Sequence, residues 1–494
     1  MFSDRDALLA AIRTNPDEDT PRLVFADWLD ENGDPDRAEF IRGQCELAGF
    51  ADENSGSYAM YEFLHERYAL GLAATDWTRI DAGVHRLVTL AARADDLLKQ
   101  HGAKWLPKLA KKYKVQWGGF CRGFPHRVAF QNIQKVVPVA ERLREAVPPV
   151  TLIDNNFTAD TVARLAEAGL LGWIAGLEVD RDCAAGLHAL GQQPEARNLR
   201  SLTVRYGDAN DFALVLADAP HLTGLRELDL SETYISAGAA ESLFQAKHLH
   251  TLRRLHVRGS GDWTADTVRV LTAGGFTNLT SLLLAHCQLD DDAAETLANC
   301  PDLANVRSLD LAHNRIGGRG ATALLCSPHL ANVAYLGLDG NPCTVVDADR
   351  LAATPPAALR LLNCHGCRFR AADVRALVQS PRLRTLWYLD FDDNNLGVSG
   401  VRALIRGFGN WCPPILWLIR NRIDDRCVQL LANWKTASGL SALHVKYNPL
   451  VTDAGIRALL DSPNLTNLDA LGVPEPSAET ETRLRARFKY PDGY

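Results

Sequence analysis

The stretch VRSLDLAHNRI at residues 306–316 decides the fold, because the same pattern returns along most of the chain. It is found again as LRELDLSETYI at 225–235, LTSLLLAHCQL at 279–289 and LSALHVKYNPL at 440–450. The second apolar residue of the L-x-L step recurs mostly every 26 or 27 residues, at Leu152, Val179, Val204, Leu230, Val257, Leu284, Leu311, Leu338, Cys364, Phe391, Leu418, Val445 and finally Ala470. Repetition with this period predicts stacked repeats rather than one compact core.

Each repeat has the pattern of a strand followed by a helix. In the L-x-L step, apolar residues at every second position predict a short strand with one buried face. The next segment carries apolar residues at helical spacing, as in Ile456, Leu459 and Leu460, and predicts a helix. One such unit cannot bury its own apolar face, so neighbouring units must stack to build a continuous core.

One polar position recurs with the repeat, three residues after the L-x-L step. It holds an asparagine or a cysteine, at Cys287, Asn314, Asn341, Cys367, Asn394, Asn421 and Asn448. We expect these side chains to point inward, where an amide can satisfy backbone groups of the turn that leaves the strand. Cysteine fits the same place as a small, weakly polar residue.

The pattern resembles the leucine-rich repeats, and among them the ribonuclease-inhibitor-like subclass, whose hallmark is L-x-x-L-x-L-x-x-N/C-x-L with an outer helix. The resemblance implies an α/β fold over residues 149–475, a leucine-rich-repeat solenoid shaped as a horseshoe with a parallel inner sheet and outer helices. Residues 476–494 are expected to form a C-terminal capping helix and tail, with the helix starting near Ser477.

Residues 1–148 lack the repeat and are expected to form a small, mainly helical N-terminal domain. Within residues 1–50, helix starts are expected near Ser3, at Thr20-Pro21 and at Asp34-Pro35, and a helix stop at Asn32-Gly33. Within residues 51–148 the pattern predicts helices over 58–70, 84–100 and 132–147, and short strands broken by glycines over 115–130.

Residues 8–48 resemble a small bacterial module called the repeat-companion domain, which precedes leucine-rich or other repeats. The matching runs are PDEDTPRL at 16–23, ADWLDENGDP at 26–35 and RAEFIRGQCELA at 37–48, with HGAKWL at 101–106 and RGF at 122–124 similar to the distal part of the module. The resemblance implies no known chemistry, because the function of that family is not established.

Composition excludes several classes of protein. The 494 residues carry 53 Lys and Arg against 60 Asp and Glu, so no excess of positive charge favours a nucleic acid. No apolar run is long enough for a transmembrane helix, and the N-terminus is acidic where a signal peptide needs a basic region. We therefore expect no membrane partner, and we expect the 11 cysteines to be reduced thiols of a cytoplasmic protein.

The sequence contains no recognisable catalytic, cofactor-binding or metal-binding motif, so we expect neither an enzyme nor a bound cofactor. Gly317, Gly318 and Gly320 are not followed by the Lys-Ser/Thr of a phosphate loop and are expected to form a repeat turn. Cys364 and Cys367 form a C-x-x-C pair that could bind zinc or act in redox chemistry. Both also fall at core positions of the repeat, so a structural role is favoured and the chemical role stays open.

Histidines and clustered acids give no stronger signal for a metal. His256, His365 and His444 lie on strands of different repeats, and adjacent strands are about 5 Å apart, so His365 and His444 are too far apart to share an ion. The acidic residues between 17 and 31 are expected to cap helices and to form salt bridges with nearby arginines.

The residues that alternate with the buried leucines are expected to point out of the concave face of the sheet. There, an aromatic and apolar group lies beside an acidic one, and the predicted partner-binding residues are Asp310, Asp339, Tyr388, Asp390, Asp392, Ile415, Trp417, Ile419, His444 and Lys446. An exposed Trp417 would be an anchor of the kind that dominates protein interfaces. The alternative is that neighbours or a flanking segment cover it.

The sequence thus predicts a non-catalytic scaffold that binds a protein partner on its concave face. The partner is expected to have a basic and apolar surface, and the chain itself is expected to be a monomer. Two alternatives remain open. One is a regulator or activator of a partner enzyme such as a small GTPase, by analogy of fold alone. The other is a structural protein that associates with itself through its repeats.

Overall fold

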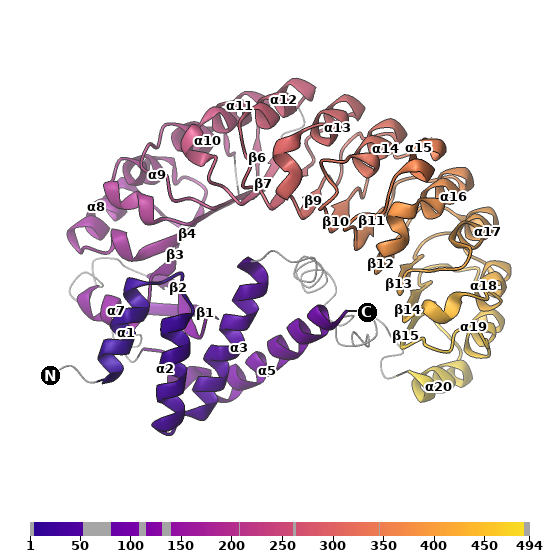
Figure 1. Cartoon of the computed structure of the whole chain (residues 1–494), viewed down its shortest axis with the longest axis horizontal. Coiled ribbons are helices and arrows are strands. Elements are labelled where there is room, and N and C mark those ends of the chain that lie inside the picture. Colours follow the sequence, from indigo (N-terminus) through magenta and orange to yellow (C-terminus); the bar gives the residue numbers. More distant parts are fainter. Residues whose placement is uncertain are drawn as a thin grey trace. The chain divides into compact units, whose positions relative to one another are not determined.

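Residues 4–52, 81–107, 115–130, 140–206, 208–259, 263–344 and 346–488 are described by the structure, a computed structural model. They fall into two compact units. Within the described ranges, the first unit holds residues 4–52, 86–258 and 274–279, and the second holds residues 81–85, 259–273 and 280–488. In the repeats of each unit, strands line one side and helices line the other (Figure 1).

The N-terminal part of the first unit is mainly helical. Its elements are α1 (Asp4–Thr14), α2 (Thr20–Glu31), α3 (Pro35–Asp52), α5 (Ala82–Trp105, in this unit from residue 86), β1 (Val115–Cys121) and β2 (Phe124–Phe130). The helix starts at Thr20 and Pro35 are confirmed, as is the stop at Asn32. The helix predicted over 58–70 lies outside the described residues. Ile12, Phe25, Ile41 and Phe124 form the apolar core that joins the helices to the hairpin.

A glycine sets the close approach of the β1–β2 hairpin to α3. Gly123 lies in the turn with φ of +84°, a conformation that other residues rarely adopt. A Cβ atom at this position would lie 2.4 Å from Cγ1 of Ile41. The two-residue turn also makes β1 and β2 antiparallel, a direction that the pattern over residues 115–130 had left open.

The repeats of the first unit add parallel strands in chain order. They are β3 (Val150–Asp154), β4 (Ile174–Asp180), β5 (Ser201–Arg205), β6 (Glu227–Ile235) and β7 (Arg254–Gly259), and each strand from β2 to β5 pairs in parallel with the next. The helices are α7 (Ala140–Ala146), α8 (Ala159–Glu167), α9 (Ala184–Gly191), α10 (Asn210–Ala217) and α11 (Ala237–Gln245). The first eight residues of the helix predicted over 132–147 are among those that are not described.

The second unit continues the same plan with shorter strands (Figure 1). Its strands are β8 (Ser281–Ala285), β9 (Ser308–Asp310), β10 (Tyr335–Gly337), β11 (Leu361–Asn363), β12 (Tyr388–Asp390), β13 (Ile415–Trp417), β14 (Ala442–His444) and β15 (Ala470–Gly472), all parallel in chain order. Its helices are α12 (Ala265–Ala273), α13 (Asp291–Ala298), α14 (Gly318–Cys326), α15 (Ala348–Ala353), α16 (Ala371–Gln379), α17 (Gly397–Phe408), α18 (Asp425–Ala432), α19 (Asp453–Leu460) and α20 (Ala478–Arg487).

The repeated apolar positions form the core, as the pattern predicts. Leu230, Leu284, Leu311 and Val445 are all fully buried. Consecutive strands pair at the expected register, with Leu309 beside Leu336 and Leu336 beside Leu362. The α/β solenoid with a parallel sheet and outer helices is therefore confirmed.

The recurring asparagines form a ladder between repeats. The Nδ2 group of Asn314 donates to the carbonyls of Leu284 (2.8 Å) and Leu311 (2.9 Å), and its Oδ1 accepts from the backbone N–H of Leu289 (3.0 Å). Cys367, at the same position of a later repeat, donates from Sγ to the Leu338 carbonyl at 3.1 Å. Each side chain thus binds the backbone of its own repeat and of the preceding one, which confirms the predicted role.

The last repeat is covered by α20, as expected. Ser477 caps this helix by accepting a hydrogen bond from the N–H of Thr480, and the helix buries Leu484. Across the described ranges, no helix has both the length and the apolar character needed to cross a bilayer.

Candidate functional site

The ten residues predicted to bind a partner lie on strands β9 to β14 or within two residues after them. Ile419 and Lys446 are half-buried. The other eight are buried, namely Asp310, Asp339, Tyr388, Asp390, Asp392, Ile415, Trp417 and His444. The expectation that this face is exposed is therefore wrong, and Trp417 itself is only 5% exposed.

Packing along the sheet accounts for part of this burial. The ring centroid of Trp417 lies 5.7 Å from that of Tyr388 and 4.8 Å from that of His444, on the strands to either side. Because parallel strands are only about 5 Å apart, large side chains on one face lie against each other. The alternation rule gave the correct direction of these side chains but not their exposure.

The acidic residues of this face are also internal and hydrogen-bonded. The hydroxyl of Tyr335 donates to Oδ2 of Asp310 at 3.2 Å. Asn363 donates from Nδ2 to Oδ1 of Asp339 at 3.1 Å. These carboxylates therefore help to order the sheet, and they do not offer a negative surface to a partner.

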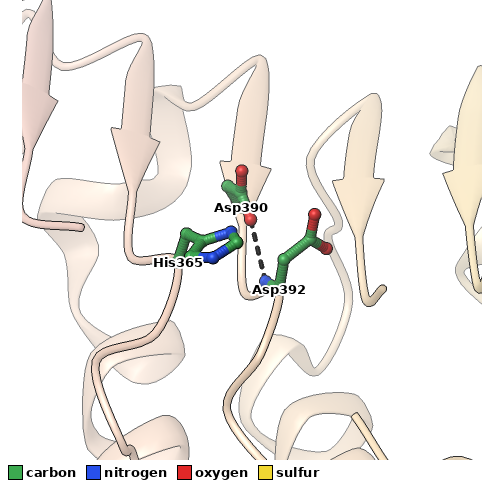
Figure 2. Close-up of side chains that lie close together, drawn as sticks. All are labelled: His365, Asp390 and Asp392. Carbon is green, nitrogen blue, oxygen red and sulfur yellow. Dashed lines mark hydrogen bonds between the residues drawn. The ribbon is translucent and has the colours of Figure 1, made fainter. Parts of the chain in front are cut away.

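Within this face, three side chains from two neighbouring strands come together (Figure 2). His365 follows β11, Asp390 ends β12, and Asp392 lies two residues further on. One imidazole nitrogen and one oxygen of each carboxyl group all lie within 4.8 Å of one another. Both aspartates are buried and His365 is half-buried. Imidazole and carboxylate groups in this arrangement can hold a metal ion or share a proton.

Burial governs the charge of the two carboxyl groups. It raises the pKa of Asp390 and the pKa of Asp392 above the usual range, and for Asp392 the adjacent Asp390 carboxylate raises it further. Hydrogen bonds from the N–H of Asp392 to Asp390 and from the N–H of Ile419 to Asp392 act in the opposite direction. The pair does not readily carry two negative charges unless a positive group joins it.

The sequence already contained the signal for this group. His365 and Asp392 occupy the same position of consecutive repeats, one residue after Cys364 and one after Phe391. The strand register, in which Asn363 pairs with Asp390, places them side by side. A comparison of the histidines with one another does not reveal the group, because the partners of His365 are aspartates on the next strand. His444 is not part of the group, as expected.

The C-x-x-C pair points away from this group. Cys364 and Cys367 are fully buried in the core, at the predicted repeat positions. The thiol of Cys367 is in hydrogen-bonding contact with two other thiols, that of Cys364 and that of Cys343 in the preceding repeat. All 11 cysteines are free thiols.

The repeat turn at Gly317 and the salt bridges of the N-terminal acids are confirmed, whereas the side chain of Asp19 does not cap α2. The backbone N–H groups of Gly317 and Gly320 donate to Oδ1 of Asp291 at 2.7 and 2.8 Å, so a side chain of the previous repeat already occupies the N-terminus of α14. In the N-terminal helices, Arg42 forms salt bridges with Asp27 (2.7 Å) and Asp30 (2.6 Å).

The exposed side chains lie at the edge of the sheet, after the carboxyl ends of the strands. In the repeats of the second unit from β8 to β14, the second residue after the L-x-L step has a left-handed backbone, at His286, His313, Gly340, Gly366, Asp393, Arg420 and Tyr447. Tyr447 is 65% exposed and nearby Leu450 is 61% exposed. The Arg420 guanidinium lies 5.1 Å from the Tyr447 ring centroid. We call Arg420, Tyr447 and Leu450 the strand-end edge.

Comparisons with known proteins agree with the repeat architecture. Residues 277–298 and 303–325 match a family model described as a leucine-rich repeat. A search of the curated proteins found no match.

Among solved structures, the chain is similar to an internalin of Listeria monocytogenes, with 18% identity over 67% of this chain and 78% of that chain and a TM-score of 0.39. The chain is also similar to a chain in the Rad7–Elc1 complex of yeast, with 14% identity over 80% of this chain and 93% of that chain and a TM-score of 0.40. A third similar structure is a chain in the complex of the Arabidopsis receptor kinase HAESA with the peptide hormone IDA and the co-receptor SERK1. Its sequence identity is 18% over 61% of this chain and 42% of that chain, with a TM-score of 0.31. The matched segments, the parallel strands and the asparagine ladder together are those of a leucine-rich-repeat fold.

Proposed function

We propose that this protein is a non-catalytic scaffold that binds another protein through the strand-end edge of its second unit. The observation that carries the proposal is the exposure of Tyr447 and Leu450, at 65% and 61%, on an otherwise well-packed repeat. Tyrosine and arginine are enriched among the residues that dominate protein interfaces. The stacking of Arg420 on Tyr447 holds both side chains in place before a partner arrives.

The charges near the strand-end edge indicate the kind of partner. Arg420 and Arg422 are exposed and Lys446 is half-buried, whereas Asp390 and Asp392 of the adjacent face are buried. A protein with an apolar pocket and an acidic rim fits this surface. This differs from the basic partner expected from the sequence, because the acidic residues that motivated it are not on the surface. Ile419 and Lys446 remain part of the proposed contact.

A photo-crosslinking experiment tests the proposal. A photoreactive amino acid replaces Tyr447 in one preparation and Leu214 in another, and each is irradiated in the native lysate. Leu214 is a matched control because it is 51% exposed but lies on α10 of the first unit. We expect a protein to be captured from position 447 and not from position 214.

The captured protein is then purified and titrated against the native chain and the double variant Tyr447→Asn, Leu450→Ser. Asparagine accepts the left-handed backbone at 447, so the fold should persist. Binding should weaken at least ten-fold, because a buried aromatic anchor contributes about 2 kcal/mol or more. Equal binding by the variant would contradict the proposal. Capture of a second copy would favour self-association, and a change in turnover of a captured enzyme would favour the regulator.

The proposal also includes the subclass of the repeat, the domain organisation, the oligomeric state and the cellular location. They are the ribonuclease-inhibitor-like subclass, the repeat-companion module in residues 1–50, the boundaries after residues 148 and 475, a monomeric state and a cytoplasmic location. The true α-helix in most repeats of the second unit supports the subclass. The packing of α1, α2 and α3 around one core supports a distinct N-terminal module.

A further inference from the structure

We propose that His365, Asp390 and Asp392 bind a divalent transition-metal ion that joins two neighbouring repeats of the second unit (Figure 2). The three ligand atoms already lie within 4.8 Å of one another. Ligand atoms around an ion such as Zn²⁺ lie about 3.5 Å apart, since each bond is about 2.1 Å long. A small side-chain rotation therefore closes the site, with no change in the backbone.

Hydrogen bonds hold both carboxylates in position. Oδ1 of Asp390 accepts from the N–H of Asp392 at 2.8 Å, and its Oδ2 accepts from the Tyr388 hydroxyl at 3.0 Å. Oδ1 of Asp392 accepts from the N–H of Ile419 at 2.6 Å. A carboxylate oxygen has two lone pairs, so each of these atoms keeps one for an ion. Supporting contacts of this kind are typical around metal ligands.

The charge of the group is not balanced by the residues around it. Asp390 is 1% and Asp392 4% exposed, yet in the described part of the chain no Lys or Arg lies within ion-pair distance of either. Nor does any described residue hydrogen-bond to Oδ2 of Asp392 or to the ring nitrogens of His365. Burying a carboxylate without a positive partner is costly, and a pair of them more so.

Two other buried or mostly buried carboxylates of this protein have their negative charge balanced by arginine. Glu178, in the first unit, has a side chain only 12% exposed and pairs with two arginines, Arg127 and Arg205. Asp373, 3% exposed, pairs with Arg370 at 3.0 Å. Asp390 and Asp392 have the imidazole of His365 beside them instead of an arginine. An imidazole can complete a metal site, but alone it cannot balance two negative charges.

The donor set narrows the choice of ion. One imidazole and two carboxylates suit Zn²⁺ or Mn²⁺, whereas Ca²⁺ requires six to eight oxygen ligands and Cu(I) prefers sulfur. Three ligands from the protein leave further coordination positions for water. The thiols of Cys364 and Cys367 lie in the core and take no part.

A titration with Mn²⁺ tests the proposal on the full chain. The protein is stripped of metal with a chelator and dialysed, and free Mn²⁺ is measured by electron paramagnetic resonance. Mn²⁺ favours carboxylate and imidazole over thiolate, so the buried cysteines do not compete for it. We expect one bound Mn²⁺ per chain, displaced by Zn²⁺.

Four variants locate the ion. His365→Gln and Asp392→Asn should each weaken binding at least ten-fold. His313→Gln and Asp393→Asn should bind as the native chain does. His313 is a matched control because it lies 3.6 Å from Asp339 on the same sheet, and Asp393 because it is the exposed neighbour of Asp392. Circular dichroism establishes that each variant is folded.

Two results would overturn the proposal. One is an unchanged affinity of His365→Gln, whose side chain is half-buried and can be replaced without unfolding the chain. The other is a native protein that binds neither Mn²⁺ nor Zn²⁺ at concentrations up to the millimolar range. That outcome would assign a shared proton, rather than an ion, to Asp390 and Asp392.

Discussion

At the residue scale, the asparagine ladder was the most predictable feature of the molecule. The column of Asn and Cys was visible in the sequence, and its inward direction followed from the need to satisfy backbone groups near the end of a buried strand. The cross-repeat contacts could not be derived in the same way. Asn421 illustrates them, because its Oδ1 accepts from the N–H of Asn394, 27 residues earlier.

Replacing a ladder asparagine should be among the most damaging polar substitutions. Asn421 is fully buried and donates from Nδ2 to the carbonyls of Phe391 (2.7 Å) and Ile419 (3.0 Å). Asn421→Ala removes the acceptor of two buried backbone N–H groups, those of Asn394 and Leu396, and takes one of two donors from each carbonyl. We expect the free energy of unfolding, measured by urea denaturation, to fall by about 3 kcal/mol.

The matched control is Asn433→Ala. This asparagine also donates its amide to a carbonyl, that of Gln429 at 2.9 Å, but at an exposed helix end. Its loss should cost less than about 1 kcal/mol, because water replaces the hydrogen bond. Equal costs at the two positions would show that the ladder is not a special source of stability.

The half-buried His126 should make the stability of the first unit depend on pH. Burial, and then the neighbouring charge of Arg127, lowers the pKa of His126 to about 4, although the carboxylate of Glu178 opposes this shift. Between about pH 6.5 and pH 4 the unfolded chain binds a proton that the folded chain does not. Stability should therefore fall as the pH falls through this window.

The size of the effect can be measured by urea denaturation at pH 7.5 and pH 5. The native chain should lose about 2 kcal/mol more than His126→Gln over this interval. Other histidines, such as the buried His444, contribute equally to both proteins and cancel in the comparison. An identical pH dependence of the two proteins would contradict the assigned pKa.

Exposure was the property that the sequence could not predict. The pattern placed Tyr388 and Trp417 on the face opposite the leucines, which is correct, but it treated that face as surface. Whether such a side chain is covered depends on the size of its neighbours on adjacent strands, such as His444 beside Trp417. Strand register was needed for that step, and it was also the step missing for His365 and Asp392.

At the element scale, the ends of helices followed their local signals closely. Ser477 caps α20 and Asn32 ends α2, as expected from their residue types. The hairpin of β1 and β2 was predicted as strands, but its antiparallel direction depends on the turn at Gly123. Local signals thus gave the kind of element more reliably than its pairing.

A capping substitution tests how much one helix end contributes. The carboxylate of Asp424 accepts from the N–H of Cys427 at 2.9 Å, and this hydrogen bond holds the pKa of Asp424 below its usual range. Asp424→Ala should lower the free energy of unfolding by about 1 kcal/mol at pH 7, while Asp424→Asn should cost much less. Urea denaturation measures both.

The same carboxylate gives a check in acid. A group whose pKa is lower in the folded state stabilises the protein above its unfolded pKa, and the contribution disappears as the pH falls through the folded pKa. The difference between the native chain and Asp424→Ala should therefore shrink below about pH 4. A difference that is independent of pH would mean that the side chain acts through packing alone.

At the scale of the whole molecule, the repeats were predictable because each needs only its neighbours. The terminal units are the exception, since one side of each would face water. At the C-terminal end, α20 packs Leu484 against the last repeat, and Arg487 donates to the Leu465 carbonyl at 2.8 Å. The apolar residues of the last repeat, such as Leu465, depend on this cover.

Loosening the cap should therefore promote association. Leu484→Asp places a charge in a site that is 1% exposed, so α20 should detach and leave the last repeat uncovered. We expect a lower Tm and the appearance of oligomers by size-exclusion chromatography with light scattering. Thr482→Asp, an exposed position of the same helix, should change neither.

The span of the ladder contacts has a consequence for how such a chain can change in length. Asn448 reaches back 30 residues to the Leu418 carbonyl and 3 residues to the Val445 carbonyl, and Asn394 makes the same two contacts two repeats earlier. Removing or duplicating one complete repeat brings together surfaces that already match. Cutting half a repeat instead would join a strand to the wrong backbone, so gains and losses of sequence should come in whole periods.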